Sequence, residues 1–574
     1  MSFFEDSTRA SGKSLAMFRI VLGAFLMLLV LRIMPYRDIY FDQVKGTAPY
    51  TFPSKLLLFF WFISAFFLAI GFKTRISSII CYTFTVIGAT FFSMTGIGSF
   101  NDDVLRISTL LLALLPSADY FSVDALLKKM SDPLHTASSQ WRLNYRLAII
   151  LILGMLYAGS AISKLLSPVW QQGLGLWIPY SVPARRWLEF SPFINNKLLM
   201  QCFAWATIIW ELAFPLLFFR RKFSLFFAIS GIALHVFIGL VFPIYFFCMG
   251  PILAYSLFIS DNFWSWLERK LKNNRQFTVT YNHEIRAQRY LAGFLISTDW
   301  SNTFQLKKGD SLALDGAVFA TTQSALNELG RFNSAIWLIA ALSRIRSIRN
   351  QLANVAILIT PQVHRSEAQK TEVKQQVFVT ICLFIIGLQT AILAYGVYAM
   401  LNKSPEQRFA YHQSGVQKFD LSPNPVSAAR IFFGINKRGL FLDASVSGSF
   451  KAVNLSLVNN GTETPLPLYD ANGYCQSLNR DFGWSVFAHY YFLKDSYTIN
   501  HEALKKFTSF WNIKNGLNPK AISYKVYTKV YTYPKAFEID YLKKQEALQW
   551  DFTGTAEWQD STFRYLPAVK DSVK

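Results

Sequence analysis

Long apolar runs separated by short basic turns occupy most of the first 260 residues, and one more run follows a polar stretch. About 20 consecutive apolar residues are needed to cross the hydrocarbon core of a bilayer as a helix. The pattern therefore predicts a polytopic α-helical membrane protein with about nine transmembrane helices. The expected helices are 14–35, 54–71, 77–94, 104–117, 144–163, 197–219, 223–241, 243–260 and 376–400.

Two polar regions divide the chain into four expected parts. A transmembrane domain at 1–260 is followed by a polar region at 261–375, a further helix at 376–400 and a second polar region at 401–574. The last region is expected to be β-rich, because hydrophobic and polar residues alternate from Ile522 to Val530. This alternation places Ile522, Tyr524, Val526 and Val530 on one face, and Ser523, Lys525, Tyr527 and Lys529 on the other. The dipeptides Asn460-Gly461 and Asn472-Gly473 are typical of hairpin turns, and a small sandwich is the expected form.

Composition favours contact with lipid. Hydrophobic residues make up 52% of the chain and charged residues only 16%, too few to cover a large water-soluble protein. The net charge of +22 falls mostly between the apolar runs and in the polar regions, as expected for basic loops beside anionic lipid. We find no nucleic-acid-binding motif and predict no nucleic acid partner.

The loop charges predict the orientation. Basic residues concentrate before the first helix and in alternate turns, so they share one side, which the positive-inside rule makes cytoplasmic. They are Arg9, Lys13, Lys73, Arg75, Lys128, Lys129, Arg142, Arg220, Arg221 and Lys222. The N-terminus and region 261–375 are then cytoplasmic, whereas segment 164–196 and region 401–574 are extracytoplasmic. Segment 164–196 is rich in Trp, Pro and Gly, so we expect it to lie at the membrane interface or to dip into the bundle, with its tryptophans at headgroup depth.

Three polar residues in or beside apolar runs are candidate functional groups, because charges within a bilayer are costly. Glu211 and His235 lie about 12 Å and 18 Å from the inner ends of their helices, so they could pair or simply hold two helices together. Lys164 ends the fifth helix, where a lysine either extends to the headgroups or, if buried, serves as a base. These depths predict no direct contact between Lys164 and Glu211. The five cysteines form no CxxC pair, so we predict neither a disulfide framework nor a metal site.

Six stretches of the membrane domain together form a pattern that resembles a known protein family. They are FRIVLG at 18–23, FNDDVLRISTLLLALLP at 100–116, YFSVDALL at 120–127, YAGSAISKLLSPVWQQG at 157–173, WELAFPLL at 210–217 and LHVFIGLVF at 234–242. In this order they resemble the HTTM family, the membrane domain shared with vitamin K-dependent γ-carboxylase. The stretch ARRWLEFSPF at 184–193 is similar to the carboxylase segment that follows its catalytic lysine.

The resemblance implies a chemistry in which a lysine deprotonates a reduced quinone. Reaction of the deprotonated quinol with oxygen yields a strong base. This base removes a γ-proton from a peptide Glu, and carbon dioxide adds to the resulting carbanion. The resemblance places the catalytic lysine on Lys164, the family histidine on His235 and the acid of the sixth helix on Glu211. We assign Trp170, Trp177 and Arg185 of the following segment as candidate cofactor-binding residues. The chain departs from the carboxylase in having one lysine rather than two, and in a spacing to Trp170 that is longer by one residue.

Residues 275–360 resemble the DCC family of thioredoxin-like thiol–disulfide proteins. FTVTYN at 277–282 corresponds to the first strand, and LDGAVFATTQSALNELG at 314–330 to a later strand and helix. Dithiol exchange needs two cysteines after the first strand, whereas this chain has Ile285 and Gln288 there. The resemblance therefore implies a cytoplasmic α/β module without redox activity.

Two hypotheses for function follow. In the first, the chain is a membrane enzyme that modifies a secreted peptide or protein, with a quinol-type cofactor, in a bacterial inner membrane. In the second, it is a non-enzymatic partner or maturation and export factor for secreted proteins, and its intramembrane polar residues only hold helices together. A cavity beside Lys164 favours the enzyme, and a solidly packed bundle there favours the partner.

Overall fold

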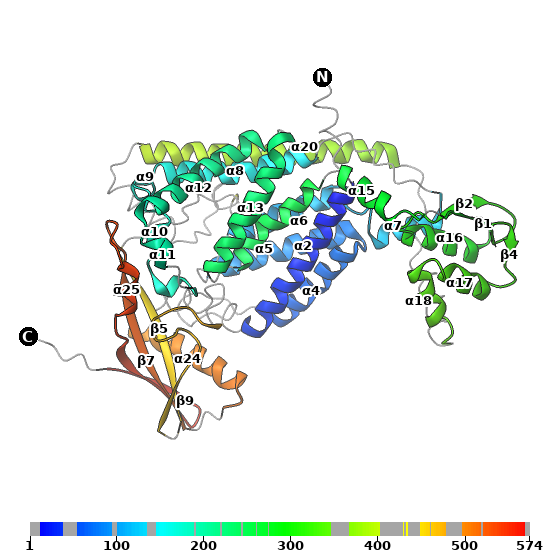
Figure 1. Ribbon diagram of the computed structural model, residues 1–574. Coiled ribbons are helices and arrows are strands. Elements are labelled where there is room, and N and C mark those ends of the chain that lie inside the picture. Colours follow the sequence, from blue (N-terminus) through cyan, green and yellow to red (C-terminus); the bar gives the residue numbers. More distant parts are fainter. Residues whose placement is uncertain are drawn as a thin grey trace, which may run out of the picture.

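The fold is that of a computed structural model, which places a helical bundle between a small α/β unit and a five-stranded sheet (Figure 1). It describes residues 12–37, 54–94, 100–134, 145–188, 191–218, 221–242, 245–259, 261–273, 275–345, 367–401, 429, 432–433, 448–459, 461–477, 496–517 and 521–568.

All nine apolar runs are helical. They form α2 (Gly12–Ile33), α4 (Ser54–Ile70), α5 (Thr74–Met94), α6 (Phe100–Leu114), α8 (Tyr145–Leu165), α12 (Lys197–Leu217), α13 (Arg221–Val241), α14 (Tyr245–Ala254) with the 3-10 turn η3 (Tyr255–Phe258), and α20 (Glu367–Leu401). In the described part of the chain, three segments are long and apolar enough to cross a membrane: Gly12–Tyr36, Lys197–Leu217 and Val373–Tyr395. The other runs form shorter apolar helices, so nine crossings stay a prediction.

Helices α12 and α13 turn apolar side chains away from the bundle. Ile209 and Leu216 in α12, and Leu225 and Ile229 in α13, are each more than 60% exposed. Water-soluble proteins rarely leave so many neighbouring large apolar side chains bare. This surface is suited to contact with lipid.

One end of the bundle is held together by charged side chains. The guanidinium of Arg19 in α2 is buried and donates to the carbonyl oxygens of Ser117, Tyr120 and Phe121, which follow α6. The carboxylate of Asp124 accepts hydrogen bonds from the backbone N–H groups of Lys73 and Thr74 at 2.8 and 2.9 Å. Asp124 therefore satisfies donors at the start of α5.

A small α/β unit attaches at this end. Its elements are β1 (Phe277–Tyr281), α16 (Arg286–Thr298), β2 (Phe304–Lys308), β3 (Ala313–Leu314), β4 (Ala317–Val318), α17 (Thr322–Gly330) and α18 (Ser334–Leu342). The sheet has the order β2-β1-β3-β4, in which β2 is parallel to β1, and β3 is antiparallel to both β1 and β4. Ile285 is the N-cap of α16, and Gln288 lies in its first turn, where its side chain accepts from the backbone N–H of Asn282.

The α/β unit docks on α7 (Val123–Ser131), a helix that follows α6. A Cβ added to Gly293 in α16 would lie 2.2 Å from the carbonyl oxygen of Lys129, so only glycine allows this approach. Phe121 stacks on Trp300 with ring centroids 5.1 Å apart. The same loop that Arg19 holds thus carries the α/β unit.

The C-terminal region contains one sheet, so the expected sandwich is wrong for the described residues. Its strands are β5 (Ser449–Asn459), β6 (Thr462–Pro465), β7 (Ala521–Thr532), β8 (Asp551–Gln559) and β9 (Thr562–Pro567), antiparallel in the order β6-β5-β7-β8-β9. The helix α24 (Tyr497–Lys514) packs on this sheet in place of a second sheet. The indole N–H of Trp558 donates a hydrogen bond to the Thr508 hydroxyl, and the Tyr524 hydroxyl donates one to the Asn512 side-chain oxygen. Asn460 lies outside the described residues, but Gly461 connects β5 to β6 with φ +80°.

The alternation in β7 holds only for its first half. Tyr524 and Val526 are buried as predicted, but Lys529 is fully buried and Val530 is 42% exposed. In the second half of β7 the face that carries Lys529 is the buried one, because α25 (Tyr541–Glu546) packs on it. Lys529 Nζ donates a hydrogen bond to the Glu546 carbonyl oxygen at 2.9 Å. Burial lowers the pKa of Lys529.

The segment after α8 packs against the bundle and into the core of the C-terminal domain. It forms α9 (Pro168–Gln171), α10 (Trp177–Tyr180) and the 3-10 turn η2 (Pro183–Arg185). Trp177 is fully buried, with its ring 4.9 Å from that of Phe537. The backbone N–H of Cys475 donates to the Arg186 carbonyl at 2.8 Å. Trp177 therefore binds the C-terminal domain, a contact that the sequence did not predict.

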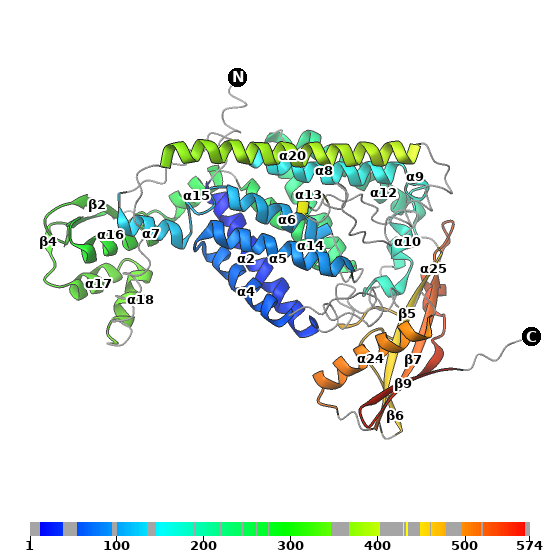
Figure 2. The same cartoon turned by 180° about the vertical axis from the view of Figure 1, so that it is seen from behind.

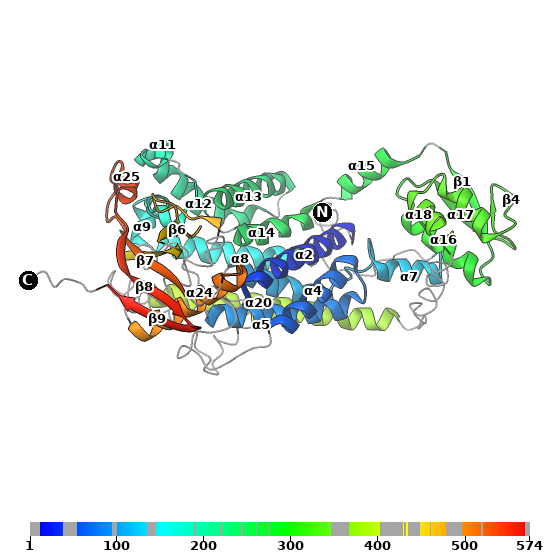
Figure 3. The ribbon, with the colours of Figure 1, turned by 90° about the horizontal axis from the view of Figure 1, so that it is seen from below.

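The α/β unit and the C-terminal sheet lie at opposite ends of the bundle in all three views (Figure 1, Figure 2 and Figure 3). This arrangement fits the predicted orientation, in which they face opposite sides of a membrane.

We therefore predict the labelling of single cysteines in intact cells by a membrane-impermeant thiol reagent. Ile513→Cys in α24 should react, whereas Val318→Cys in β4 should react only after lysis, since the basic turns place it inside. Both native residues are well exposed, and Cys202→Ser removes the exposed native thiol. Reaction of Val318→Cys in intact cells would contradict the orientation.

Trp177→Ala should destabilise the contact between the bundle and the C-terminal domain by about 3–5 kcal/mol, since it leaves a large cavity. Thermal unfolding and limited proteolysis of the C-terminal domain measure this loss. The matched control is Trp205→Ala, at a tryptophan that is 39% exposed on α12. Equal effects of the two substitutions would show that Trp177 has no special role.

Candidate functional site

Lys164 and Glu211 form a buried ion pair, so the prediction that they do not touch is wrong. The Nζ atom of Lys164 in α8 contacts Oε1 of Glu211 in α12. Their residues are only 5% and 7% exposed. Lys164 therefore does not extend to the headgroups.

The direction of side chains explains the error. Gly154 lies beside Pro215, and the Gln172 carbonyl accepts from Gln201 Nε2 at 3.0 Å, so α8 and α12 run antiparallel. In this register Lys164 and Glu211 differ in depth by about 9 Å at the backbone. Helical side chains point toward the N-terminus of their own helix, so in an antiparallel pair these two point toward each other. The prediction compared backbone depths alone.

The ion pair is enclosed by neighbours from α8 and α9. The Ser160 hydroxyl accepts from Lys164 Nζ at 3.1 Å, and the ring of Trp170 lies 4.9 Å from Nζ as a cation–π partner. Trp170 is 1% exposed and packs with Ala204 and Ile208 of α12. Oε2 of Glu211 is buried and has no hydrogen-bond partner among the described residues. That oxygen is therefore available to accept a hydrogen bond from a bound molecule.

His235 lies near the pair but does not bind Glu211 in this structure. Its Nδ1 is 2.8 Å from the carbonyl oxygen of Gly231, one turn earlier in α13. Its ring lies 6.3 Å from that of Tyr157 in α8, and it is within electrostatic reach of Lys164. Nδ1 carries the proton in the neutral ring if it donates to this carbonyl, which leaves Nε2 as an acceptor.

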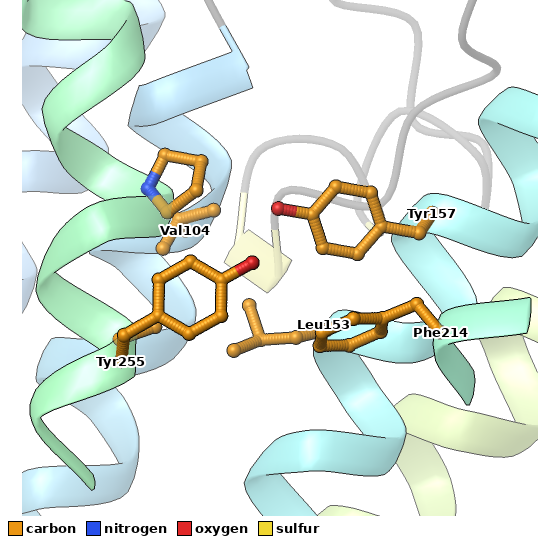
Figure 4. Close-up of a pocket in the computed structure, with 7 residues that line it drawn as sticks. Val104, Leu153, Tyr157, Phe214 and Tyr255 are labelled. Carbon is orange, nitrogen blue, oxygen red and sulfur yellow. The ribbon is translucent and has the colours of Figure 1, made fainter. Parts of the chain in front are cut away.

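A small pocket lies about two turns from Lys164 toward the N-terminus of α8. Its lining residues come from α6, α8, α12, α14 and η3: Val104, Leu153, Tyr157, Phe214, Pro251, Ala254 and Tyr255. The hydroxyl groups of Tyr157 and Tyr255 face each other across it (Figure 4). It has room for roughly one water molecule.

Two predicted cofactor residues make their contacts elsewhere. Trp177 packs on Phe537, and the Arg185 guanidinium lies 5.2 and 5.5 Å from the rings of Phe450 and Tyr533. These are residues of the C-terminal domain. Of the three, Trp170 is the one that touches Lys164.

Sequence reasoning missed Ser160, Tyr157 and Tyr255. Ser160 precedes Lys164 by four residues, a spacing that places both on one helical face and could have identified it. Tyr255 comes from η3, far from α8 in the sequence, so no sequence spacing predicts that it lies opposite Tyr157. Among the described residues, no group of three or more His, Cys, Asp or Glu side chains could hold a metal ion.

The site is suited to proton transfer. If the proton on Lys164 Nζ passes to Glu211, the ammonium and carboxylate become a neutral amine and a neutral acid, with neither formal charge left in the apolar interior. The neutral amine is then a base, and the acid holds the proton. Comparisons of the chain with protein-family models, with curated proteins and with solved structures find no match.

Removing either partner of the ion pair should cost more stability than removing both. Lys164→Met or Glu211→Leu alone should destabilise the bundle by about 3–5 kcal/mol, because each leaves an unpaired buried charge. The double variant should recover most of this loss, as measured by thermal unfolding in detergent.

The control for side-chain loss is Lys197→Met, at the exposed start of α12. This substitution should be almost neutral. Additive losses in the double variant would mean that the two side chains do not interact.

Proposed function

We propose that this protein is an integral membrane enzyme that modifies a secreted peptide or protein by γ-carboxylase-like chemistry, with a quinol-type lipid-soluble cofactor. The observation that supports it best is the burial of Lys164, Glu211 and His235 around one site. They come from three separate helices, and buried ionisable groups that cluster in this way are typical of functional sites.

The arrangement of the matching stretches adds support. Three of the stretches that resemble HTTM proteins form parts of α8, α12 and α13, the helices that carry Lys164, Glu211 and His235. At the other end, the strand order β2-β1-β3-β4 with β3 antiparallel is the order expected of a thioredoxin-like module. Ile285 and Gln288 stand at the start of α16, where a dithiol motif would lie, so we propose a module without redox activity.

In the proposed mechanism, Lys164 is the general base. Glu211 accepts its proton through the direct contact and leaves the amine free to take a proton from the substrate side. Ser160 holds Nζ in place, and Trp170 excludes water from the pair. His235, with Nε2 free to accept, receives a proton at a second position of the same site.

The residues present fit a quinol in their hydrogen-bonding chemistry. Oε2 of Glu211 is a buried acceptor without a partner and suits a hydroxyl donor, while the ring of Trp170 offers an aromatic wall. When bound, a quinol supplies the reducing equivalents of the reaction. Because Trp170 is buried and covers Lys164, the segment from Leu165 to Gln172 would have to move outward to admit a quinol beside the pair.

The closed packing also favours a second function, that of a non-enzymatic membrane partner or maturation and export factor for secreted proteins. Lys164 and Glu211 satisfy each other, and Trp170 seals them. A pair used only to fix α8 against α12 would look the same.

Lys164→Arg distinguishes the two proposals. Arginine keeps the positive charge and can keep the pair with Glu211, but a guanidinium stays protonated and cannot act as a base. The enzyme proposal predicts a folded protein whose host cells lose carboxylated glutamates from their secreted proteins, as detected by mass spectrometry.

The control is the double variant Lys164→Met with Glu211→Leu, which removes the base and should keep the fold. It should be as inactive as Lys164→Arg. If Lys164→Arg keeps the modification or the cellular function, the lysine is structural and the partner proposal stands.

A further inference from the structure

Helix α18 of the α/β unit leaves one face bare. Ile336 and Ala340 pack into the core of the unit, whereas Trp337 and Leu338 are 61% and 52% exposed. Ile345, just after the helix, is 50% exposed. Such an apolar strip on a nine-residue helix is costly in water and calls for a covering partner.

The charge around α18 suits an anionic partner. Residues 331–350 contain four arginines and no acidic residue. Arg344 is exposed just after the helix, Arg331 before it pairs with Glu328 at 2.9 Å, and Arg346 and Arg349 follow outside the described residues. Aromatic and aliphatic side chains flanked by arginine are typical of helices that lie in a membrane interface.

The position of α18 points to the same partner. In all three views α18 lies nearer to the bundle than β4 does (Figure 1, Figure 2 and Figure 3). The helix α15 (Asp261–Leu271), which follows η3 at this end, marks where the apolar bundle stops. It exposes Phe263 and Trp266, and Lys270 lies 5.1 Å from the Trp266 ring. Trp and Lys side chains of this kind are typical of the headgroup region.

We propose that α18 binds the surface of the bilayer on the side of the α/β unit, with Trp337 and Leu338 among the lipid headgroups and the arginines beside anionic phosphates. This contact is a second attachment of the unit, in addition to α7. Because the α/β unit also packs on α7 and Phe121, this contact restrains the loop that Arg19 binds. The position of that loop then depends on the lipid composition. It does not depend on enzymatic activity.

The test uses spin labels on the full chain, with Cys202→Ser as background, in nanodiscs of phosphatidylcholine alone or mixed with phosphatidylglycerol. Leu338→Cys carries the label, and Val318→Cys is the control, because Val318 is 64% exposed on β4, away from the bundle. The label at position 338 should collide several-fold more often with oxygen, which dissolves in lipid, than with a water-soluble nickel complex. The label at position 318 should show the opposite preference.

Anionic lipid should increase the oxygen preference at position 338, and Arg344→Glu should reduce it. Equal access of nickel to positions 338 and 318 would overturn the proposal, because it means that α18 faces water. Protection of position 338 from both reagents would overturn it too, because it means that protein covers the helix.

Discussion

The ion pair between Lys164 and Glu211 is the constraint on which this end of the structure depends. It fixes the register of α8 against α12, and Trp170 closes over it as the chain leaves α8. A few residues later the same segment enters the core of the C-terminal domain through Trp177. An unpaired charge here would be costly in an apolar interior, so the helices, the covering segment and the C-terminal domain are stabilised together.

The other end of the bundle follows a similar principle with different groups. There the buried guanidinium of Arg19 binds carbonyl oxygens of the loop after α6, and Asp124 caps α5. Because α7 continues this loop and receives α16, the α/β unit is attached through polar contacts that the bundle itself requires. Each end of the bundle thus uses buried charge to position an adjoining domain.

Much of the fold could be predicted from local pattern, because an apolar run of helical length has few other stable forms next to lipid. The same local information identified Lys164, Glu211 and His235. It failed where the outcome depended on distant partners. The contact between Lys164 and Glu211 depends on the antiparallel register of α8 and α12. The burial of Lys529 depends on α25, and that of Trp177 depends on the C-terminal domain.

The most direct test of this account is a cryo-electron microscopy map of the full chain in a nanodisc, at a resolution that shows side chains. We predict continuous density between Lys164 Nζ and the Glu211 carboxylate, with Trp170 over the pair and the C-terminal domain against α10. A map in which Lys164 extends to the headgroups, away from Glu211, would contradict the account.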